Sequence, residues 1–321
     1  MDLLGIDLGG TKLATAVLSE DGRIINKDNC VLGYRKGAEV GALIREKIIV
    51  SMDYAERDGL KISSIGISVP GISHSGSGTV WAPNIPGWEN YPLLTEVKKA
   101  SSEIPVTIDS DRACYIMGEV WKGSARGCRN AIFLAVGTGI GVGIMIEGEV
   151  LRGSHDIAGA IGWMALDRPF RDQYINCGCF EHYASGEGIA KIARKLLEED
   201  KTYSGVLKNK PAVKITSHDI FSAYEHSDIV AVKVIGQCIE FWGMAVANLV
   251  SLFNPEKIIL GGGVFGPAVS LIPLISEEAS RWAQPVSIKQ VSIVASALAG
   301  DAGIFGACYM ALKAISRLNK N

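Results

Sequence analysis

The sequence predicts an α/β protein built from two related halves that face each other across a central cleft. Three observations lead to this fold class. The chain has 321 residues, about twice the usual size of a domain. Three short strands joined by glycine turns occur near the start of the chain, and the same pattern returns near residue 131. Segments with helical periodicity fill the remaining length. We therefore interpret the chain as the duplication of a whole domain.

The composition excludes several classes of protein. Hydrophobic residues make up 48% of the chain and charged residues 21%, with a mean hydropathy of +0.21, which indicates a buried core. The net charge of −2 leaves no basic excess for nucleic acid. The opening Met1-Asp2-Leu3 lacks the basic start of a secretory signal, and the longest apolar run, residues 241–253, is too short to span a bilayer. Seven scattered cysteines fit a reducing cytosol. We expect a cytoplasmic protein that binds neither nucleic acid nor membranes.

The first half begins with three strands and two turns. The turns are Gly9-Gly10-Thr11 and Asp21-Gly22, and a later strand ends at Pro70-Gly71. A strand follows the first glycines where a Rossmann motif needs a helix, and the Walker spacing G-x-x-x-x-G-K-[ST] is absent. Both common nucleotide-binding motifs are therefore excluded. The strands expected here are residues 3–8, 12–18, 23–31 and 65–69.

The second half repeats this order from residue 131, with turns at Gly137-Thr138-Gly139 and Glu147-Gly148. We expect the boundary between the halves near residues 109–123. The expected domains are residues 1–115 and 116–300, with a C-terminal helix that packs back on the first domain. The strands expected are residues 131–136, 140–146, 149–151 and 257–260, and the helices of the whole chain are residues 37–59, 112–121, 180–199, 229–252 and 301–318.

Three glycine turns are candidate phosphate-binding sites. In Asp7-Leu8-Gly9-Gly10-Thr11-Lys12, two glycines allow the backbone to approach a phosphate, and Thr11 adds a donor. Asp7 suits a metal-bound water, since a triphosphate travels with Mg²⁺. Alternate glycines from Gly137 to Gly143 clear one face of a strand, and Gly261-Gly262-Gly263 precedes a helix. Each turn alone could also be an ordinary hairpin, a packing contact or a loop, but two in matching places of a duplication favour phosphate binding.

Asp109-Ser110-Asp111 lies between an extended segment and a helix. A carboxylate there can accept the proton of an attacking hydroxyl in phosphoryl transfer. Taken alone, a cap for the helix N-terminus is the commoner use of such residues. Both interpretations stay open on the residues alone.

The order of these motifs resembles the ROK family of repressors and kinases, within the sugar-kinase, hexokinase and actin superfamily. The resemblance covers nearly the whole chain. It rests on residues 7–12, Val69-Pro70-Gly71, residues 82–88, the Asp111 helix with Gly118-Glu119, residues 137–141, Ala158-Gly159, residues 178–181 and Ala184-Ser185-Gly186.

The resemblance implies a duplicated ribonuclease-H-like fold of the actin and hexokinase type. It implies transfer of the γ-phosphoryl of ATP, with Mg²⁺, to a sugar hydroxyl, often the primary one, and a homodimer. Asp111 would be the catalytic base, and the turn at Gly261 would meet the adenosine. The residues implied for the nucleotide are Asp7, Gly9, Gly10, Thr11, Lys12, Gly137, Thr138, Gly139, Gly261, Gly262 and Gly263, and those for the sugar are Gly71, Asn84, Ser110, Asp111, Trp163 and Glu181.

The chain departs from the family pattern at the sugar. Where the family has A-G-E-I-G-H, this chain has Ala160 in place of the sugar-binding Glu and Trp163 in place of the zinc-binding His. Ser110 replaces an Asn. Of the zinc cluster C-x-C-G-x-x-G-C only Gly178-Cys179 remains, with Cys177 at a variable position, so we expect no metal site of the protein's own, although His155 and His182 could complete a different one.

These departures bear on the substrate. A pocket that gives up two polar groups recognises glucose less well, and Trp163 offers a stacking surface. We expect a hexose derivative changed near C1 or C2, and not glucose itself, as the best substrate of an ATP-dependent sugar kinase. The alternatives are a non-catalytic sugar sensor, although no DNA-binding segment is expected before the strand at residue 3, and a pseudokinase of the same fold.

Overall fold

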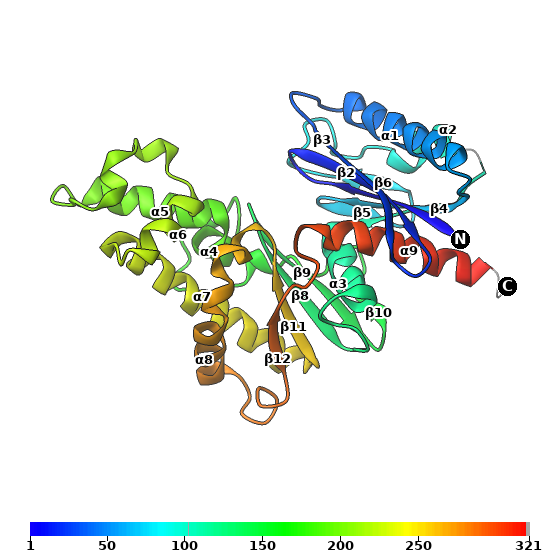
Figure 1. Cartoon of the computed structure of the whole chain (residues 1–321). Coiled ribbons are helices and arrows are strands. Elements are labelled where there is room, and N and C mark those ends of the chain that lie inside the picture. Colours follow the sequence, from blue (N-terminus) through cyan, green and yellow to red (C-terminus); the bar gives the residue numbers. More distant parts are fainter. Residues whose placement is uncertain (102, 319–321) are drawn as a thin grey trace.

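The computed structural model of the chain describes residues 1–101 and 103–318, which form two α/β halves joined near two crossing helices (Figure 1). The first sheet has five strands in the order β3-β2-β1-β4-β7. β2 is antiparallel to β1 and β3, whereas β4 is parallel to β1 and β7. The strands are β1 (Asp2–Leu8), β2 (Lys12–Ser19), β3 (Ile24–Val31), β4 (Ile62–Val69) and β7 (Val106–Ser110).

The second sheet repeats the first. Its order is β10-β9-β8-β11-β12, again with antiparallel neighbours on one side of β8 and parallel neighbours on the other. The strands are β8 (Ala131–Val136), β9 (Ile140–Ile146), β10 (Glu149–Val150), β11 (Lys257–Gly261) and β12 (Ser292–Ala295). The identical order and directions confirm the predicted duplication and the ribonuclease-H-like class.

The strand register of the first sheet brings polar residues to one edge. Asp7 on β1 is paired with Ser68 on β4, and Ser68 is paired with Asp109 on β7. Because the three strands are parallel, their carboxyl ends meet at the same edge. This edge is where open α/β sheets place ligands.

Helices cover both faces of the first sheet. α1 (Ala38–Arg57) and α2 (Leu93–Ser101) pack on one face, and α9 (Ala302–Leu318) packs on the other. α9 lies so close that a Cβ atom on Gly66 of β4 would collide with the carbonyl oxygen of Ala307. A small hairpin of β5 (Ile72–His74) and β6 (Thr79–Trp81) follows β4.

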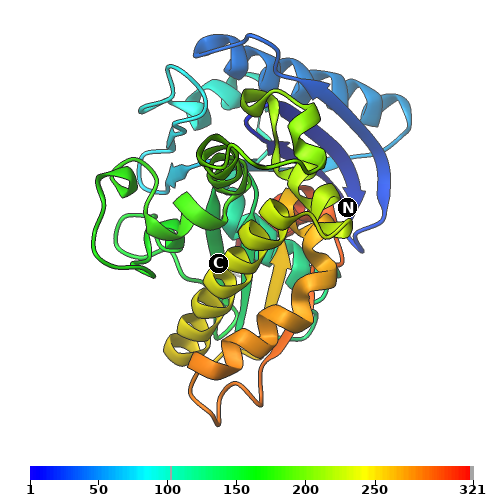
Figure 2. The ribbon, with the colours of Figure 1, turned by 90° about the vertical axis from the view of Figure 1, so that its left-hand side faces the viewer.

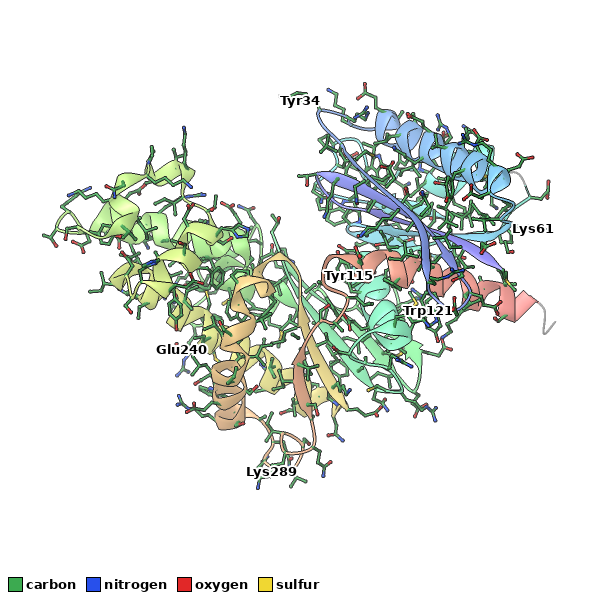
Figure 3. The ribbon with its side chains drawn as sticks, viewed as in Figure 1. Tyr34, Lys61, Tyr115, Trp121, Glu240 and Lys289 are labelled. Carbon is green, nitrogen blue, oxygen red and sulfur yellow. The ribbon has the colours of Figure 1, made fainter. Side chains whose placement is uncertain are left out.

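The two halves meet where α9 crosses α3 (Asp111–Lys122). A Cβ atom on Gly118 of α3 would lie 3.0 Å from the amide nitrogen of Gly306. Trp121 lies beside α9 (Figure 3), stacked on Tyr309 with 5.5 Å between the ring centres. Glycines at the crossing allow this approach, and aromatic stacking extends it. The C-terminal helix thus lies on the first sheet, while the exact extent of each domain stays a prediction.

The second half carries the remaining helices. α7 and α8 lie side by side on it (Figure 2). The single helix predicted for residues 180–199 is wrong, because Ser185 is extended (φ −80°, ψ 167°) and its Oγ accepts the N–H of Gly188 at 3.0 Å as a helix cap. The helices are α4 (Cys179–Ala184), α5 (Gly186–Glu199), α6 (Ser217–Glu225), α7 (Ile229–Phe253) and α8 (Ile272–Trp282). The 3-10 helices are η1 (Ile161–Trp163), η2 (Asp172–Tyr174), η3 (Val206–Asn209), η4 (Ala212–Lys214), η5 (Gly263–Phe265), η6 (Pro267–Leu271) and η7 (Ala299–Asp301).

α7 contains the long apolar run of the sequence. By length and composition it is the one helix, in the part of the chain described, that could cross a membrane. More than half of its most apolar window is buried, and α7 contacts α5, α6 and α8 in the larger core. The apolar sequence is therefore accounted for by core packing.

Candidate functional site

The first glycine hairpin joins β1 to β2 at the edge described above. The amide of Gly9 donates to the carbonyl of Lys12 at 2.8 Å, which closes the turn. Gly10, Thr11 and Lys12 are exposed. A Cβ atom on Gly10 would lie 2.8 Å from Nδ2 of Asn84, so a glycine here admits that side chain. The structure thus brings Asn84 against the hairpin predicted to bind phosphate.

Asp7 lies half-buried beside this hairpin. Its Oδ1 accepts the hydroxyl of Ser68 at 2.6 Å. Burial raises the pKa of Asp7, although the bond from Ser68 and the charge of Lys12 oppose the change. A Cβ atom on Gly303 of α9 would lie 2.5 Å from both carboxylate oxygens, so only glycine leaves room there. Among the described residues Asp7 forms no ion pair, so the hydrogen bond from Ser68 and the packing of α9 hold this carboxylate in place.

Asp111 is the first residue of α3. Ser110 precedes it and caps the helix, with its Oγ accepting the N–H of Ala113 at 3.4 Å. Burial raises the pKa of Asp111 from 3.8 to about 6, Arg112 opposes this, and the charge of Asp7 adds to it. A carboxylate with a pKa near neutrality suits general-base work. Ser110 therefore caps the helix, and the carboxylate of Asp111 does not serve as that cap.

The second glycine hairpin joins β8 to β9. A Cβ atom on Gly137 would meet nothing within 4 Å, and Thr138 is exposed. Glu181 of α4 lies behind this hairpin, where its Oε2 accepts the N–H of Ile140 at 2.6 Å. A Cβ atom on Gly139 would lie 2.7 Å from the same oxygen. Burial raises the pKa of Glu181. Glu181 therefore supports the hairpin with one of its oxygens.

Trp163 ends η1 with its side chain 58% exposed. A Cβ atom on Gly178 would lie 2.5 Å from the Cα of Trp163, so the start of α4 packs directly on η1. His182 on α4 is buried, and its Nδ1 has no hydrogen-bond partner among the described residues. Within residues 1–101 and 103–318, no three His, Cys, Asp or Glu side chains are grouped as metal ligands. Whether any metal binds near Cys177 stays a prediction.

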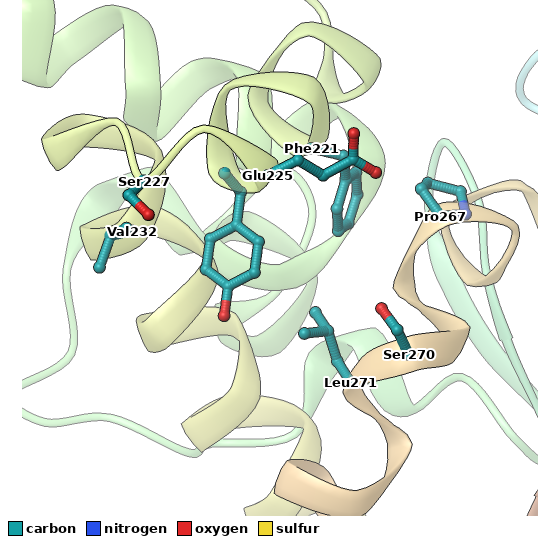
Figure 4. Close-up of a pocket in the computed structure, with 8 residues that line it drawn as sticks. Phe221, Glu225, Ser227, Val232, Pro267, Ser270 and Leu271 are labelled. Carbon is teal, nitrogen blue, oxygen red and sulfur yellow. The ribbon is translucent and has the colours of Figure 1, made fainter.

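The third glycine turn follows β11. Gly262 has φ +90°, and a Cβ atom on it would lie 2.5 Å from the carbonyl oxygen of Val136, whereas Gly263 faces open space. The turn therefore lies beside the end of β8, close to the second hairpin. A surface pocket of about 390 Å³ lies beyond it, between α6, α7 and η6 (Figure 4). Its lining includes Phe221, Glu225, Ser227, Val232, Pro267, Ser270 and Leu271.

Contacts between the two halves were missed by the sequence reasoning. Arg152 forms an ion pair with Asp109, and Asp156 accepts both the N–H and the hydroxyl of Ser75. Arg152 and Asp109 also line a pocket of about 240 Å³ at the β5–β6 hairpin. The segment after β10 therefore reaches the carboxyl end of β7 in the other half. A sequence shows no signal for such pairs, because their partners are far apart in the chain.

Glu119 of α3 belongs to the Gly118-Glu119 motif, for which the sequence predicted no role. It is fully buried. Its carboxylate accepts the N–H of Ser124 at 2.6 Å, the hydroxyl of Ser296 at 2.5 Å and the N–H of Leu298 at 3.2 Å. It therefore ties α3 to the segment that leads into α9. The one signal available in the sequence was an acidic residue among the apolar positions of a predicted helix.

The predicted site residues form two groups, one in each half, and Asp111 begins α3, which contacts α9 and β9 where the halves meet. Asp7, the first hairpin and Asn84 lie in the first half. The second hairpin, Glu181, Trp163 and the turn at Gly261 lie in the second half. Gly71 has φ +93° and follows β4, and its carbonyl accepts Nη2 of Arg112 at 3.1 Å. The roles of these residues remain predictions.

Three known proteins illustrate what the chain is similar to. A glucokinase of Halalkalibacterium halodurans is 33% identical, covering 94% of this chain and 92% of its own. The structure of a ROK family glucokinase from Streptomyces griseus, in complex with glucose and AMPPNP, is 29% identical with a TM-score of 0.78, covering 98% and 100% of the two chains. A ROK family transcriptional regulator, a homolog of the E. coli MLC protein, is 26% identical with a TM-score of 0.85, covering 98% of this chain and 78% of the regulator.

These similarities agree with the duplicated sheets and with the order of the glycine turns. The sequence profile of the ROK family matches residues 3–314, which leaves almost none of the chain outside it. The duplicated sheets fit this match over the whole chain, and the chain belongs to the ROK family.

Proposed function

We propose that this chain is an ATP-dependent sugar kinase, which transfers the γ-phosphoryl of Mg-ATP to a hydroxyl, the primary one, of a hexose derivative. One observation carries the proposal: Asp111 is the first residue of α3, close enough to Asp7 of β1 for the charge of Asp7 to act on it, and its pKa is raised to about 6. Phosphoryl transfer needs positioning and charge neutralisation, with little covalent help from the protein.

The nucleotide side fits the geometry of the hairpins. Gly137 and Gly263 have open space where a side chain would stand, so main-chain N–H groups can approach a phosphate. Lys12 and Thr11 are exposed at the first hairpin and can add charge and a hydroxyl donor. Mg²⁺ bound with ATP would neutralise phosphate charge, and Asp7 would hold one of its waters.

The acceptor side requires one proton transfer. Asp111 accepts the proton of the sugar hydroxyl as the oxygen forms its bond to the γ-phosphorus. The bond from that phosphorus to the bridging oxygen breaks, and ADP leaves with the electron pair. A base with a pKa near 6 is ionised at pH 7 and still basic enough to take this proton.

The residues expected around the sugar favour a substrate other than glucose. Ala160 lacks the polar group that the family pattern has there, and Trp163 presents an exposed ring beside Gly178. Loss of hydrogen-bonding groups lowers the discrimination in favour of glucose. We therefore favour a hexose changed near C1 or C2, such as a glycoside, an amino sugar or a ketose. A substrate panel in which glucose gives the highest kcat/KM would contradict this.

The test is ADP release with Mg-ATP across hexoses, amino sugars, ketoses, polyols and β-glycosides. Wild type is compared with Asp111→Asn and with the control Asp53→Asn, which changes an exposed carboxylate on α1. Sugar-dependent release that is lost only in Asp111→Asn supports the kinase. Release that survives in Asp111→Asn would refute the role of Asp111.

A second function has support from one comparison. The chain resembles a ROK family transcriptional regulator with a TM-score of 0.85, and its sugar motif departs from the kinase pattern at Ala160 and Trp163. A non-catalytic sugar sensor or pseudokinase would bind a sugar without ADP release. Calorimetric sugar binding by a preparation that shows no turnover would favour this function over the kinase.

The assembly and the compartment complete the proposal. We expect a homodimer in the cytoplasm, with no nucleic-acid or membrane partner. None of the seven cysteines, all of which are described, forms a disulfide, which suits a reducing compartment. Light scattering of the purified chain would test the dimer, and a monomeric mass would refute it.

A further inference from the structure

Arg112 follows the proposed base and lies between both halves of the molecule. Its Nη2 donates to the carbonyl of Gly71 in the first half at 3.1 Å. A Cβ atom on Gly141 of β9 would lie 2.7 Å from Cδ of Arg112 and 3.6 Å from the carbonyl oxygen of Gly159. The side chain therefore crosses from α3 over the start of β9, among the segments that the family resemblance places at the sugar.

Arg112 differs from its charged neighbours in its partners. Arg152 is paired with Asp109, and Asp156 is engaged by Ser75. Among the residues that the structure describes, Arg112 forms no ion pair, and Gly71 takes the one hydrogen bond of its guanidinium. A guanidinium offers five N–H donors in a planar fork. A half-buried fork with most donors unused is suited to a carboxylate or a phosphate.

A neighbouring departure from the family pattern also makes the surroundings of Arg112 less negative. Ala160, close after Gly159, stands where the family pattern has a carboxylate. A carboxylate there would repel an anionic ligand, and a cation beside it would be neutralised. With Ala160 in that place, this motif supplies no carboxylate to compete with the acceptor for the positive charge of Arg112, which otherwise acts on Asp111.

We propose that Arg112 makes the acceptor site selective for a sugar derivative that carries an anionic group, a carboxylate or a phosphate, bound by the guanidinium fork between Gly71 and β9. This inference rests on the proposed kinase function and specifies its substrate class. Successive side chains diverge by about 100° around a helix, so the anion lies to one side of the hydroxyl that Asp111 deprotonates. The arginine binds the acceptor and accepts no proton itself, although its charge lowers the pKa of Asp111.

The experiment compares matched acceptors that keep the same primary hydroxyl. Gluconate is paired with glucitol, and glucose 1-phosphate with methyl glucoside, so that the two pairs separate a carboxylate from a phosphate. For wild type with Mg-ATP we expect kcat/KM at least about tenfold higher for the anionic member of one pair. At pH 8.5, where Asp111 stays ionised even without the charge of Arg112 that lowers its pKa, Arg112→Ala should lower that value about 10- to 100-fold, mainly through KM, and change the neutral member by less than about threefold.

Two variants control for folding and for general loss of charge. Arg57→Ala removes an exposed guanidinium that also donates to a backbone carbonyl, that of Asp53, and should leave all four acceptors unchanged. Arg112→Lys keeps the charge without the fork, and should lose about 3- to 10-fold for the anionic member alone. This second variant keeps the test decisive if Arg112→Ala does not fold.

Two results would overturn the inference, and a third leaves the decision to calorimetry. In the first, wild type prefers the neutral member of both pairs while turnover is still lost in Asp111→Asn; this result supports the kinase and refutes the anionic acceptor. Arg112→Ala with kcat lowered equally for both members would assign Arg112 to the transferred phosphoryl group. If no acceptor supports turnover, the kinase itself fails, and calorimetry decides the binding: gluconate or glucose 1-phosphate must bind wild type and not Arg112→Ala.

Discussion

Asp111→Asn should make the protein more stable while it abolishes phosphoryl transfer. The native structure holds the Asp111 carboxylate where burial raises its pKa from 3.8 to about 6. A raised pKa means that the folded state disfavours the charged form relative to the unfolded state. Asparagine has no charge to desolvate, and it keeps an oxygen that can accept the N–H of Arg112, which Asp111 now accepts at 2.7 Å.

The size of the effect follows from the pKa. The difference between 3.8 and about 6 corresponds to about 3 kcal/mol between the charged and neutral forms. Asp111 is only half-buried, so solvent screens part of this, and we expect a gain of about 1–3 kcal/mol in the free energy of unfolding at pH 7.5. In wild type the penalty develops as the pH rises from about 4 to about 6. The gain should therefore shrink to less than about 1 kcal/mol at pH 4 and vanish near pH 3, where the carboxyl is neutral in both the folded and the unfolded state.

Urea unfolding at pH 7.5 and pH 4 measures the prediction. Asp219→Asn is the control of opposite sign: burial would raise the pKa of Asp219, but the bonds from Lys210 and Thr216 outweigh it and lower this pKa to about 2. That variant should lose about 1–2 kcal/mol at pH 7.5, a loss that shrinks as the pH falls toward 2. An Asp111→Asn protein that is less stable than wild type at pH 7.5 would refute the reasoning.

Three further predictions concern the site and the junction of the halves. The kcat/KM of the kinase should fall about tenfold per pH unit below about pH 6, as Asp111 becomes protonated; a flat profile down to pH 5 would contradict this. Glu119→Ala leaves buried donors without an acceptor and should cost about 2–4 kcal/mol in urea unfolding, whereas the exposed control Glu89→Ala should be neutral; a cost below about 1 kcal/mol would count against the network. Gly66→Ala should cost more than about 2 kcal/mol by displacing α9, while Gly76→Ala, with open space around it, should not; equal melting temperatures would refute the packing argument.

Much of the fold could be predicted because local patterns carry it. Apolar runs bounded by glycine turns predicted β1, β2, β8 and β9 to within a residue or two at each end. The helix predicted for residues 180–199 failed at Ser185, where a single hydroxyl caps a new helix and breaks a continuous apolar pattern. The repeated order of turns also predicted the duplication, which the two sheets confirm.

The motifs predict part of the chemistry of the candidate site. The residue types at Asp7, Asp111 and the glycine hairpins indicate a phosphate-binding site and a general base. The resemblance placed them in one family, and the comparisons confirm that family. Their roles as ligands and base stay predictions, because no pattern of residues measures a distance to a substrate.

The sequence by itself determined the class of each half, the succession of its first three strands along the chain and the residue types at the hairpins, since these depend on near neighbours in the chain. Only the tertiary structure decided which distant groups meet. It buried Glu119 under the segment before α9, paired Asp109 with Arg152, and laid the guanidinium of Arg112 between Gly71 and β9. The physical reason is that burial and pairing energies belong to contacts between segments far apart in the sequence, which exist only once both sheets have formed and α3 has crossed α9.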